Sequence, residues 1–189
     1  MKKTTITLTI LAIALLALTS IGMTAEAVAT FEEPVLISPA GQSAEGFMVR
    51  SICQKAGINA TLKPLANADS LKGIKTLLLV AGGSSKGLGA AKVDDKAEKQ
   101  RIIDLRKAAE KAKIRIIVLH LGGVARRGPL SDDFNRLAAE GGEIIVVKED
   151  GDKDGFFAKI AKDKGVLYKP IKQPAEVLPL FKEWFGKTE

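Results

Sequence analysis

The chain has 189 residues, of which 29 are Lys or Arg and 22 are Asp or Glu, so its formal net charge is +7. The basic residues are spread along predicted helix faces and are not gathered into aromatic-flanked patches, which argues against nucleic acid as a partner. Cys53 is the only cysteine, which excludes an intrachain disulfide.

The N-terminal segment has the pattern of a secretory signal peptide. Lys2 and Lys3 precede an apolar stretch over residues 6–18, and small residues follow at 25–29. The stretch is shorter than the roughly 20 apolar residues of a spanning helix, so a retained anchor is the less favoured alternative. We therefore expect a signal peptide at residues 1–29 and a single domain at 30–189. The mature protein is expected in the periplasm or outside the cell, without stable membrane insertion.

Strand-length apolar runs alternate with amphipathic stretches of helix length along the rest of the chain. Strands are predicted at 34–38, 60–65, 75–81, 114–120 and 143–148. Helices are predicted at 44–56, 94–113, 131–140 and 155–164, followed by a C-terminal helix with Trp184 in the core. This order predicts a three-layer α/β/α sandwich with a mostly parallel sheet, Rossmann-like or flavodoxin-like, with the strand order left open.

Some boundaries and positions follow from residue type. Gly57 suits the end of the first helix, and Ser131 and Asp154 suit the starts of two later ones. The runs "TLLLVA", "IRIIVLH" and "EIIVVK" are almost entirely aliphatic and should form the sheet centre. Ligands of such sheets bind beyond the carboxyl ends of the strands, so the loops there are where a site is expected.

The stretch "VAGGSSKGLGAA" at residues 80–91 is similar to the glycine-rich loop of short-chain dehydrogenases, and a Tyr-x-x-x-Lys follows at Tyr168 and Lys172. In that family this pair lies on one helix, whereas Pro170 stands between them here, and the family's glycine loop follows its first strand and not its third. A phosphate loop would need Lys after Gly87, where Leu88 stands. Both nucleotide interpretations are therefore disfavoured.

The same stretch contains a G-x-S-x-G pattern centred on Ser85. His120, the only histidine, ends the next predicted strand, so Ser85 and His120 are candidate catalytic residues of a hydrolase or transferase. No acidic residue stands where the third member of such a triad is expected. A structural, hydrogen-bonded histidine is the alternative interpretation.

An internal comparison favours an anion site. Aligning Gly82-Gly83 with Gly122-Gly123 places Lys86 and Arg126 at equivalent positions after two strands. Glycine loops with free N–H groups and fixed cations together favour a small anionic ligand. The predicted ligand-binding residues are Gln42, Ser43, Gly83, Ser84, Ser85, Lys86, Gly122, Gly123, Arg126 and Arg127. The alternative is that the glycines only form turns, while the cations are solvated or paired with Asp150, Asp152 and Asp154.

The acidic loop has a further possible role. Asp150, Asp152 and Asp154, followed by Gly155, reproduce the opening of an EF-hand calcium loop. The twelfth position of that loop, which should be Glu, is Ala161, and Lys153 lies among the ligands. Calcium is therefore the minor hypothesis, and a turn in which Asp154 caps the next helix is the major one.

Four stretches together resemble a family of exported bacterial proteins defined as a domain of unknown function and numbered 6305. They are "EPVLISPAGQSAEGFMV", "LLLVAGGSSKGLGAA", "GGVARRGPLSDDF" and "VVKEDGDKDGFFAKIA". The resemblance implies an exported single α/β domain, and it carries over no catalytic residue and no cofactor.

The leading hypothesis from the sequence is an exported domain that binds a small anionic ligand, without an assigned reaction. An enzyme using Ser85 and His120 in the same cleft is the second hypothesis. A protein-interaction module of the cell envelope is the third, and it predicts a cleft closed by pairs between basic residues and Asp.

Overall fold

The structure, a computed structural model, describes residues 30–187, so the predicted signal peptide at residues 1–29 lies outside it. The strands are β1 (Val35–Ala40), β2 (Ala60–Leu62), β3 (Thr76–Ala81), β4 (Arg115–His120), β5 (Ile144–Lys148) and β6 (Leu167–Ile171). The helices are α2 (Glu45–Lys55), α3 (Ser85–Ala91), α4 (Asp95–Lys111), α5 (Pro129–Ala139), α6 (Phe156–Lys164) and α7 (Val177–Trp184). Short 3-10 turns are η1 (Ala68–Leu71), η2 (Gly123–Arg126), η3 (Glu149–Gly151) and η4 (Pro174–Glu176). Within residues 30–187, no helix has the length and apolarity needed to cross a membrane.

All six strands form one sheet in the order β2-β1-β3-β4-β5-β6. Every neighbouring pair is parallel, with Val35 opposite Thr76 and Ile117 opposite Ile144. This is the flavodoxin-like order with one strand added at the edge. The predicted α/β sandwich is confirmed, and its sheet is entirely parallel.

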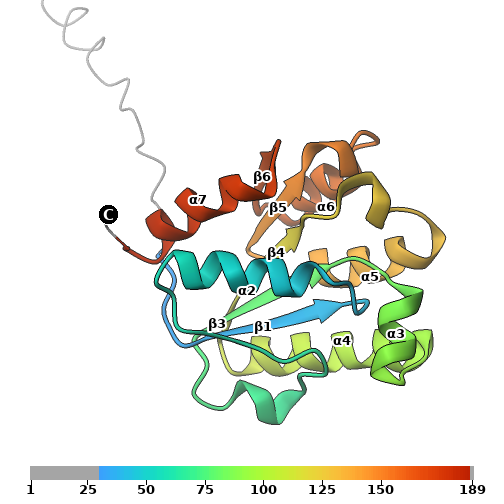
Figure 1. Cartoon of the computed structure of the whole chain (residues 1–189), viewed down its shortest axis with the longest axis horizontal. Coiled ribbons are helices and arrows are strands. Elements are labelled where there is room, and N and C mark those ends of the chain that lie inside the picture. The colour runs from blue at the N-terminus through green and yellow to red at the C-terminus, as the bar shows by residue number, and fades with distance from the viewer. Residues whose placement is uncertain (1–29, 188–189) are drawn as a thin grey trace, which may run out of the picture.

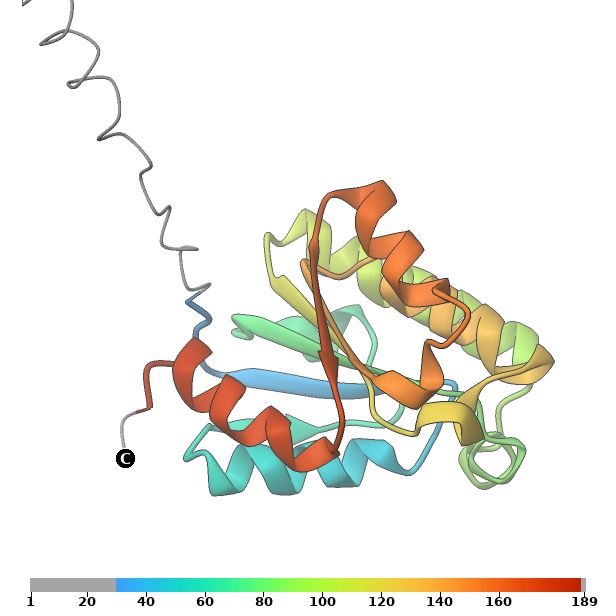
Figure 2. The same cartoon turned by 90° about the horizontal axis from the view of Figure 1, so that it is seen from above.

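Helices cover both faces of the sheet (Figures 1 and 2). On one face, Ile102 of α4, Phe134 of α5 and Phe157 of α6 pack in a single apolar cluster. On the other face, Ile52 of α2 and Trp184 of α7 belong to a second cluster. The core position predicted for Trp184 is therefore confirmed. Burial of apolar surface on both sides of the sheet is the main stabilising contribution to such a fold.

The strand predictions are confirmed for the interior of the sheet and incomplete at its edge. β3, β4 and β5 are interior strands, as their aliphatic runs predict. β6 was not predicted because its residues Leu167–Ile171 are mostly half-exposed or exposed and include Pro170. Proline lacks an N–H group and is tolerated mainly in edge strands, where one side of the backbone needs no partner.

The start of one helix differs from the prediction by two residues, and one helix was not predicted. α5 begins at Pro129 and not at Ser131, because Gly128 turns the chain at φ +109° and proline suits the first helical position. α3 is an additional short helix, capped by the Ser84 hydroxyl, which accepts a hydrogen bond from the Gly87 N–H group. Gly57 follows α2 in the left-handed region, as expected.

Candidate functional site

The chain places β2 on one side of β1 and β3 on the other side, so the sheet has a topological switch point between β1 and β3. A cleft lies at this switch point. Its volume is about 720 Å³. Figure 1 shows β1 pointing toward α3 at this edge of the sheet. The cleft is lined by residues from β1, β2, α2, α3 and the loops after β1 to β4, namely Pro39, Gln42, Ser43, Ala44, Phe47, Leu62, Pro64, Ser84, Lys86, Gly87, Ala90, Ala91 and Arg126. In doubly wound sheets, ligands bind in this crevice.

A buried ion pair lies beside this cleft. Glu98 of α4 is fully buried, and both of its carboxylate oxygens accept hydrogen bonds from Arg101, at 2.7 Å each. Arg101 also donates to the Ser38 hydroxyl and to the carbonyls of Pro39 and Ala66. All five guanidinium N–H groups thus have an acceptor, which is the condition under which a buried charge is tolerated.

The same carboxylate holds the loop that follows β1. Glu98 Oε1 accepts from the Gly41 N–H group and from the Gln42 side-chain amide, both at 3.0 Å. The amide also donates to the Pro64 carbonyl, so it joins the loops after β1 and β2. Gln42 is therefore not an available ligand donor, although it lines the cleft, and its observed role is to fix the loop.

Gly87 is required for packing at this loop. A Cβ atom at position 87 would lie 1.8 Å from the Gln42 carbonyl oxygen. Gln42 itself has φ +58°, a conformation that non-glycine residues rarely adopt. The glycine pattern of residues 83–89 therefore allows α3 to approach the β1 loop closely, which explains Gly87 without a nucleotide.

Ser43 is the buried polar residue of the cleft that lacks a partner. Its exposed fraction is 3%. Its hydroxyl makes no hydrogen bond to any residue in the described part of the chain. A buried hydroxyl without a partner is costly, by about 1–3 kcal/mol, and calls for an explanation such as a ligand or an ordered water.

Two cations flank this hydroxyl, as the internal comparison predicts. β3 and β4 are neighbours, and Lys86 and Arg126 both line the cleft. Lys86 is exposed and makes no ion pair within residues 30–187. Arg126 donates through Nε to Glu45 Oε1 at 2.9 Å, and its remaining guanidinium nitrogens make no hydrogen bond to other described residues.

Gly122, the first glycine of the second pair, makes room for Arg126, and Gly82 lies in contact distance of the same side chain. A Cβ atom at Gly122 would lie 2.1 Å from Arg126 Cγ, and one at Gly82 would lie 3.4 Å from Arg126 Cβ and 3.2 Å from Ser43 Oγ. The Arg126 stem therefore crosses the ends of both strands. This placement brings a cation from the β4 loop to the serine of the β1 loop.

The backbone N–H groups after β3 are used within the protein. The Gly82 and Ser84 N–H groups donate to the carbonyls of Ala40 and Gly41, and the Gly83 N–H group donates to Ser131 Oγ at 3.1 Å. The expectation that Gly83 and Ser84 offer free backbone donors is wrong. The loop is satisfied by β1 and α5, so an anion in the cleft would depend on side chains.

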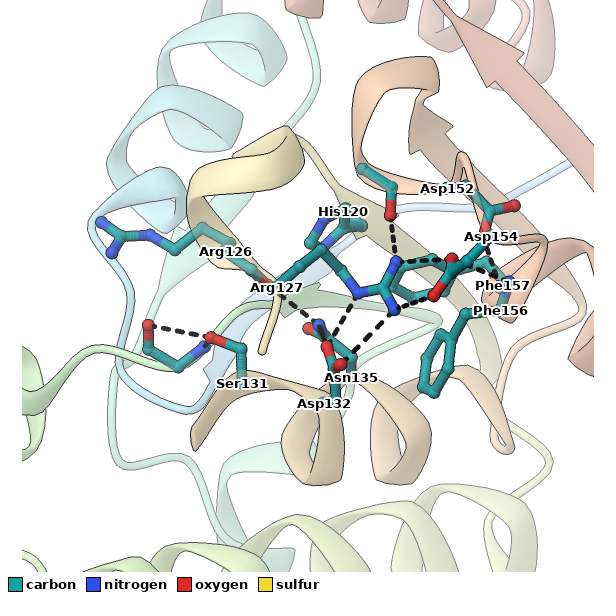
Figure 3. Close-up of polar contacts among 12 residues, drawn as sticks. His120, Arg126, Arg127, Ser131, Asp132, Asn135, Asp152, Asp154, Phe156 and Phe157 are labelled. Carbon is teal, nitrogen blue, oxygen red and sulfur yellow. Dashed lines mark hydrogen bonds and ion pairs between the residues drawn. The ribbon is translucent and has the colours of Figure 1, made fainter. Parts of the chain in front are cut away.

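Arg127 lies in a different environment from its neighbour. Its guanidinium donates to Asp132 at 2.8 Å, to both oxygens of Asp154 at 2.8 and 2.9 Å, and to the Gly151 carbonyl (Figure 3). It also stacks over Phe156, with 4.7 Å between the guanidinium carbon and the ring centroid. Arg127 is therefore committed to the protein, contrary to its predicted role in ligand binding. Figure 3 shows the Arg126 guanidinium pointing away from this cluster.

Hydrogen bonds from Arg127 lower the pKa of the Asp154 carboxyl to about 2. The same hydrogen bond to Asp154 raises the pKa of Arg127 above its usual value, against the opposing effect of burial. The pairing of a cation with Asp154 is the alternative that the sequence left open, and it is confirmed for Arg127.

His120 is a structural residue. It is fully buried, and its ring nitrogens lie 3.2 Å from the carbonyl oxygens of Ala81 and Gly123. Burial lowers the pKa of the imidazole, although these two hydrogen bonds oppose the shift. Ser85 is exposed at the start of α3 and makes no hydrogen bond to His120. The structure therefore does not assemble the catalytic pair predicted from the G-x-S-x-G pattern.

The acidic loop does not form a calcium site. Asp150 pairs with Lys148 at 2.6 Å, and Asp154 pairs with Arg127. Asp152 accepts from the N–H groups of residues 157 and 158 and from the Tyr168 hydroxyl at 2.7 Å. No group of three or more potential metal ligands occurs within residues 30–187. Asp152 is the main cap of α6, and Asp154 adds a longer bond to the Phe156 N–H group at 3.3 Å.

Sequence analysis missed Glu98, Arg101 and Glu45. The spacing of Glu98, Ile102, Leu105 and Ala109 already places the carboxylate on the buried stripe of α4, and all four are fully buried. An acidic residue on an apolar stripe indicates a buried partner, and Arg101 stands three residues away. Glu45 offered no comparable signal, because its partner Arg126 is 81 residues away in sequence.

Residues 32–185 match the family model described as "Domain of unknown function (DUF6305)", and the chain belongs to this family. No curated protein sequence matches the chain. Among solved structures, it is similar to a GDSL-like lipase from Bacteroides thetaiotaomicron, at 9% identity and a TM-score of 0.34 over 72% of this chain. This match spans 66% of the lipase, slightly less than two thirds of its length. It is also similar to AlinE4, an SGNH-hydrolase family esterase, at 12% identity and a TM-score of 0.30 over 79% of both chains. These likenesses concern the fold alone.

Proposed function

We propose that this member of the DUF6305 family binds a small anionic ligand in the cleft at the switch point, and that it does so outside the cytoplasm after removal of residues 1–29. The observation that carries the proposal is the Ser43 hydroxyl, which is buried and has no hydrogen-bond partner among residues 30–187. Lys86 and Arg126 line the same cleft. Together they supply a hydrogen-bond donor and two positive charges to one small volume.

The arginine supports this proposal through its preorganisation. Gly122 leaves space for its stem, and Glu45 holds its Nε atom, so the side chain has little freedom to lose on binding. The guanidinium nitrogens beyond Nε then present a planar pair of donors of the kind that binds carboxylate or phosphate oxygens. Lys86, by contrast, is exposed and adds a mobile charge at the rim.

Binding without a reaction is favoured over the hydrolase or transferase hypothesis. The only histidine of the chain is buried with both ring nitrogens beside carbonyls, so it is not placed to act as a base on a bound molecule. The interaction-module hypothesis predicts a cleft closed by pairs between basic residues and Asp. Such pairs occur around Arg127, whereas the cleft next to Arg126 has an open volume.

The proposed export follows from the residue pattern at 1–29, which lies outside the described residues. Expression in a bacterial host followed by cell fractionation and intact mass measurement tests it. The proposal predicts a processed chain beginning near Thr30 in the periplasm or medium. A full-length chain retained in the cytoplasm or membrane would contradict it.

Thermal unfolding of the purified protein against phosphate, acetate, sugar phosphates and nucleotides tests the binding. A ligand at about 100 times its dissociation constant should add about 2.7 kcal/mol, which raises the Tm by several degrees. The shift should disappear in the Lys86→Ala/Arg126→Ala variant. It should persist in the matched control Lys96→Ala/Arg136→Ala, which removes an exposed Lys and an exposed Arg that do not line the cleft. A shift that survives in the first variant, or a panel without any shift, would refute the proposal.

A further inference from the structure

The cleft has two unlike sides, and the sheet order separates them. The larger apolar side chains come from α2 and from the β2 side, namely Phe47, Leu62 and Pro64, whereas Pro39 of β1 and Ala90 and Ala91 of α3 are smaller apolar residues within the other side. The polar donors come from the β1, β3 and β4 side, namely Ser43, Lys86 and Arg126. Because β2 and β4 lie on opposite sides of the β1 and β3 pair, a bound molecule would have an apolar neighbour on one side and cations on the other.

The polar side suits a single negative charge. Arg126 already shares its charge with Glu45, and the charge of buried Glu98 is balanced by Arg101. The N–H groups of residues 82–84, which could cradle a polyphosphate, are bonded within the protein. One serine hydroxyl and the two outer nitrogens of one guanidinium match the oxygens of one carboxylate.

The apolar side includes an exposed aromatic side chain. Phe47, which lines the cleft, has an exposed fraction of 57%. Exposed apolar surface beside a concave site commonly marks where a ligand is bound. A cleft of 720 Å³ is also much larger than an inorganic anion requires, and it falls in the range of about 300–1,000 Å³ for organic ligands.

We infer that the ligand is an amphiphilic carboxylate, with its head group at Ser43 and Arg126 and an alkyl or aryl body against Phe47, Leu62 and Pro64. The inference rests on the proposed function, because it assigns a chemical class to the anion of that same cleft. It requires affinity to increase with the length of the apolar body, whereas a simple anion site would not show this dependence.

Isothermal titration calorimetry of the purified protein with acetate, butyrate and octanoate measures the effect of length. Each added pair of methylene groups should tighten binding by about tenfold if it is fully buried. Octanol, which has the same body without the charge, should bind at least tenfold more weakly than octanoate. Octyl phosphate, which carries the alternative head group, should not bind tighter than octanoate.

Phe47→Ser should abolish most of the chain-length dependence, because it removes the side chain that contacts the alkyl body. Met48→Ser is the matched control, because Met48 is also an exposed apolar residue of α2 but does not line the cleft. It should preserve the dependence. Far-UV circular dichroism of both variants establishes that the fold is unchanged, which is expected because both side chains are exposed.

The possible failures are distinguishable. Equal affinities for acetate and octanoate, both lost in Lys86→Ala/Arg126→Ala, would overturn the inference and leave the proposed function intact. Absence of binding by every anion would overturn both. Octanol binding as tightly as octanoate, tighter binding of octyl phosphate, or an unchanged length dependence in Phe47→Ser would each overturn the assignment of an amphiphilic carboxylate to this site.

Discussion

The carboxyl edge of the sheet contains two regions with similar residues, of which one forms an open cleft and the other is filled by hydrogen bonds. The open region, residues 41–43, 84–91 and Arg126, surrounds a cleft with an unpartnered serine. The closed region, residues 127–132 and 149–157, is filled by hydrogen bonds from Arg127 to Asp132 and Asp154 and by the bond from the Phe157 N–H group to Asp152. The difference shows that a cation near a strand end becomes a candidate ligand residue only where no acidic loop reaches it.

Arg126 and Arg127 illustrate this difference most directly. They are adjacent in sequence, but η2 ends between them and the backbone of Arg127 is extended at φ −115°, ψ 163°. Their side chains consequently diverge, one over the strand ends and one toward the acidic loop (Figure 3).

We expect the largest loss of stability when the buried Glu98–Arg101 ion pair, which supports the open region, is broken. Glu98→Gln leaves the buried Arg101 without its counter-ion and should lower the free energy of unfolding by about 3–5 kcal/mol. Binding to the cleft should weaken as well, because the loop of Gly41 and Gln42 loses its charged acceptor. Urea denaturation measures the stability, and Glu110→Gln, an exposed change on the same helix, is the control. A loss below about 1 kcal/mol would contradict the assigned role.

The two arginines should differ in their effect on binding. Arg127→Ala removes the hydrogen bonds of the closed region and should lower stability by about 2 kcal/mol, with anion binding unchanged. Arg126→Ala should abolish binding and should also cost about 1–3 kcal/mol, because it leaves the largely buried carboxylate of Glu45 without its partner. Urea denaturation and calorimetry on both variants measure these quantities. The reverse pattern would place the ligand in the closed region.

His120 should make the closed region sensitive to acid. Burial lowers its pKa below the ordinary value of 6.5, so the unfolded chain takes up the proton more readily than the folded one. Stability should therefore be complete above pH 6.5 and decline below it, by at most about 1.4 kcal/mol per pH unit. Because the chain has only one histidine, His120→Gln should remove this component from urea denaturation curves between pH 5 and pH 8. Identical pH slopes in parent and variant would contradict a lowered pKa.

The smallest loss of stability is expected at Ser43. Ser43→Ala removes a buried hydroxyl that has no partner among the described residues, so the free energy of unfolding should not decrease and should rise by up to about 1–3 kcal/mol. Anion affinity should nevertheless decrease by about tenfold for the loss of one hydrogen bond to a charged group. Ser131→Ala is the matched buried serine, because it leaves the Gly83 N–H group unsatisfied and should cost about 1–3 kcal/mol. Equal stability losses in the two variants would indicate that Ser43 has a structural partner.

The fold class and the edge of the sheet at which a site should be sought follow from the residue pattern alone. Strands covered on both faces must be aliphatic throughout, so "TLLLVA", "IRIIVLH" and "EIIVVK" identified the interior of the sheet. Because the strands are parallel, the loops after them lie at the same edge of the sheet. Ser43, Lys86 and Arg126 were therefore predicted to belong to one ligand site, and all three line the cleft. These features depend on local periodicity and on chain order, both of which a sequence displays directly.

Only the tertiary structure decided which polar groups are available. Gly41 bonds to Glu98 across 57 residues, and Arg127 bonds to Asp154 across 27. Such pairings depend on how far each loop extends over the strand ends and on the direction in which it turns, which residue types along the chain do not specify. Gln42, Arg127 and His120 form hydrogen bonds to other residues of the protein. Among the described residues, the Ser43 hydroxyl has no hydrogen-bond partner and Lys86 has no ion pair. The physical reason is that the hydrophobic pattern encodes burial locally, whereas the pairing of buried polar groups is settled by contacts between loops that are distant in the sequence.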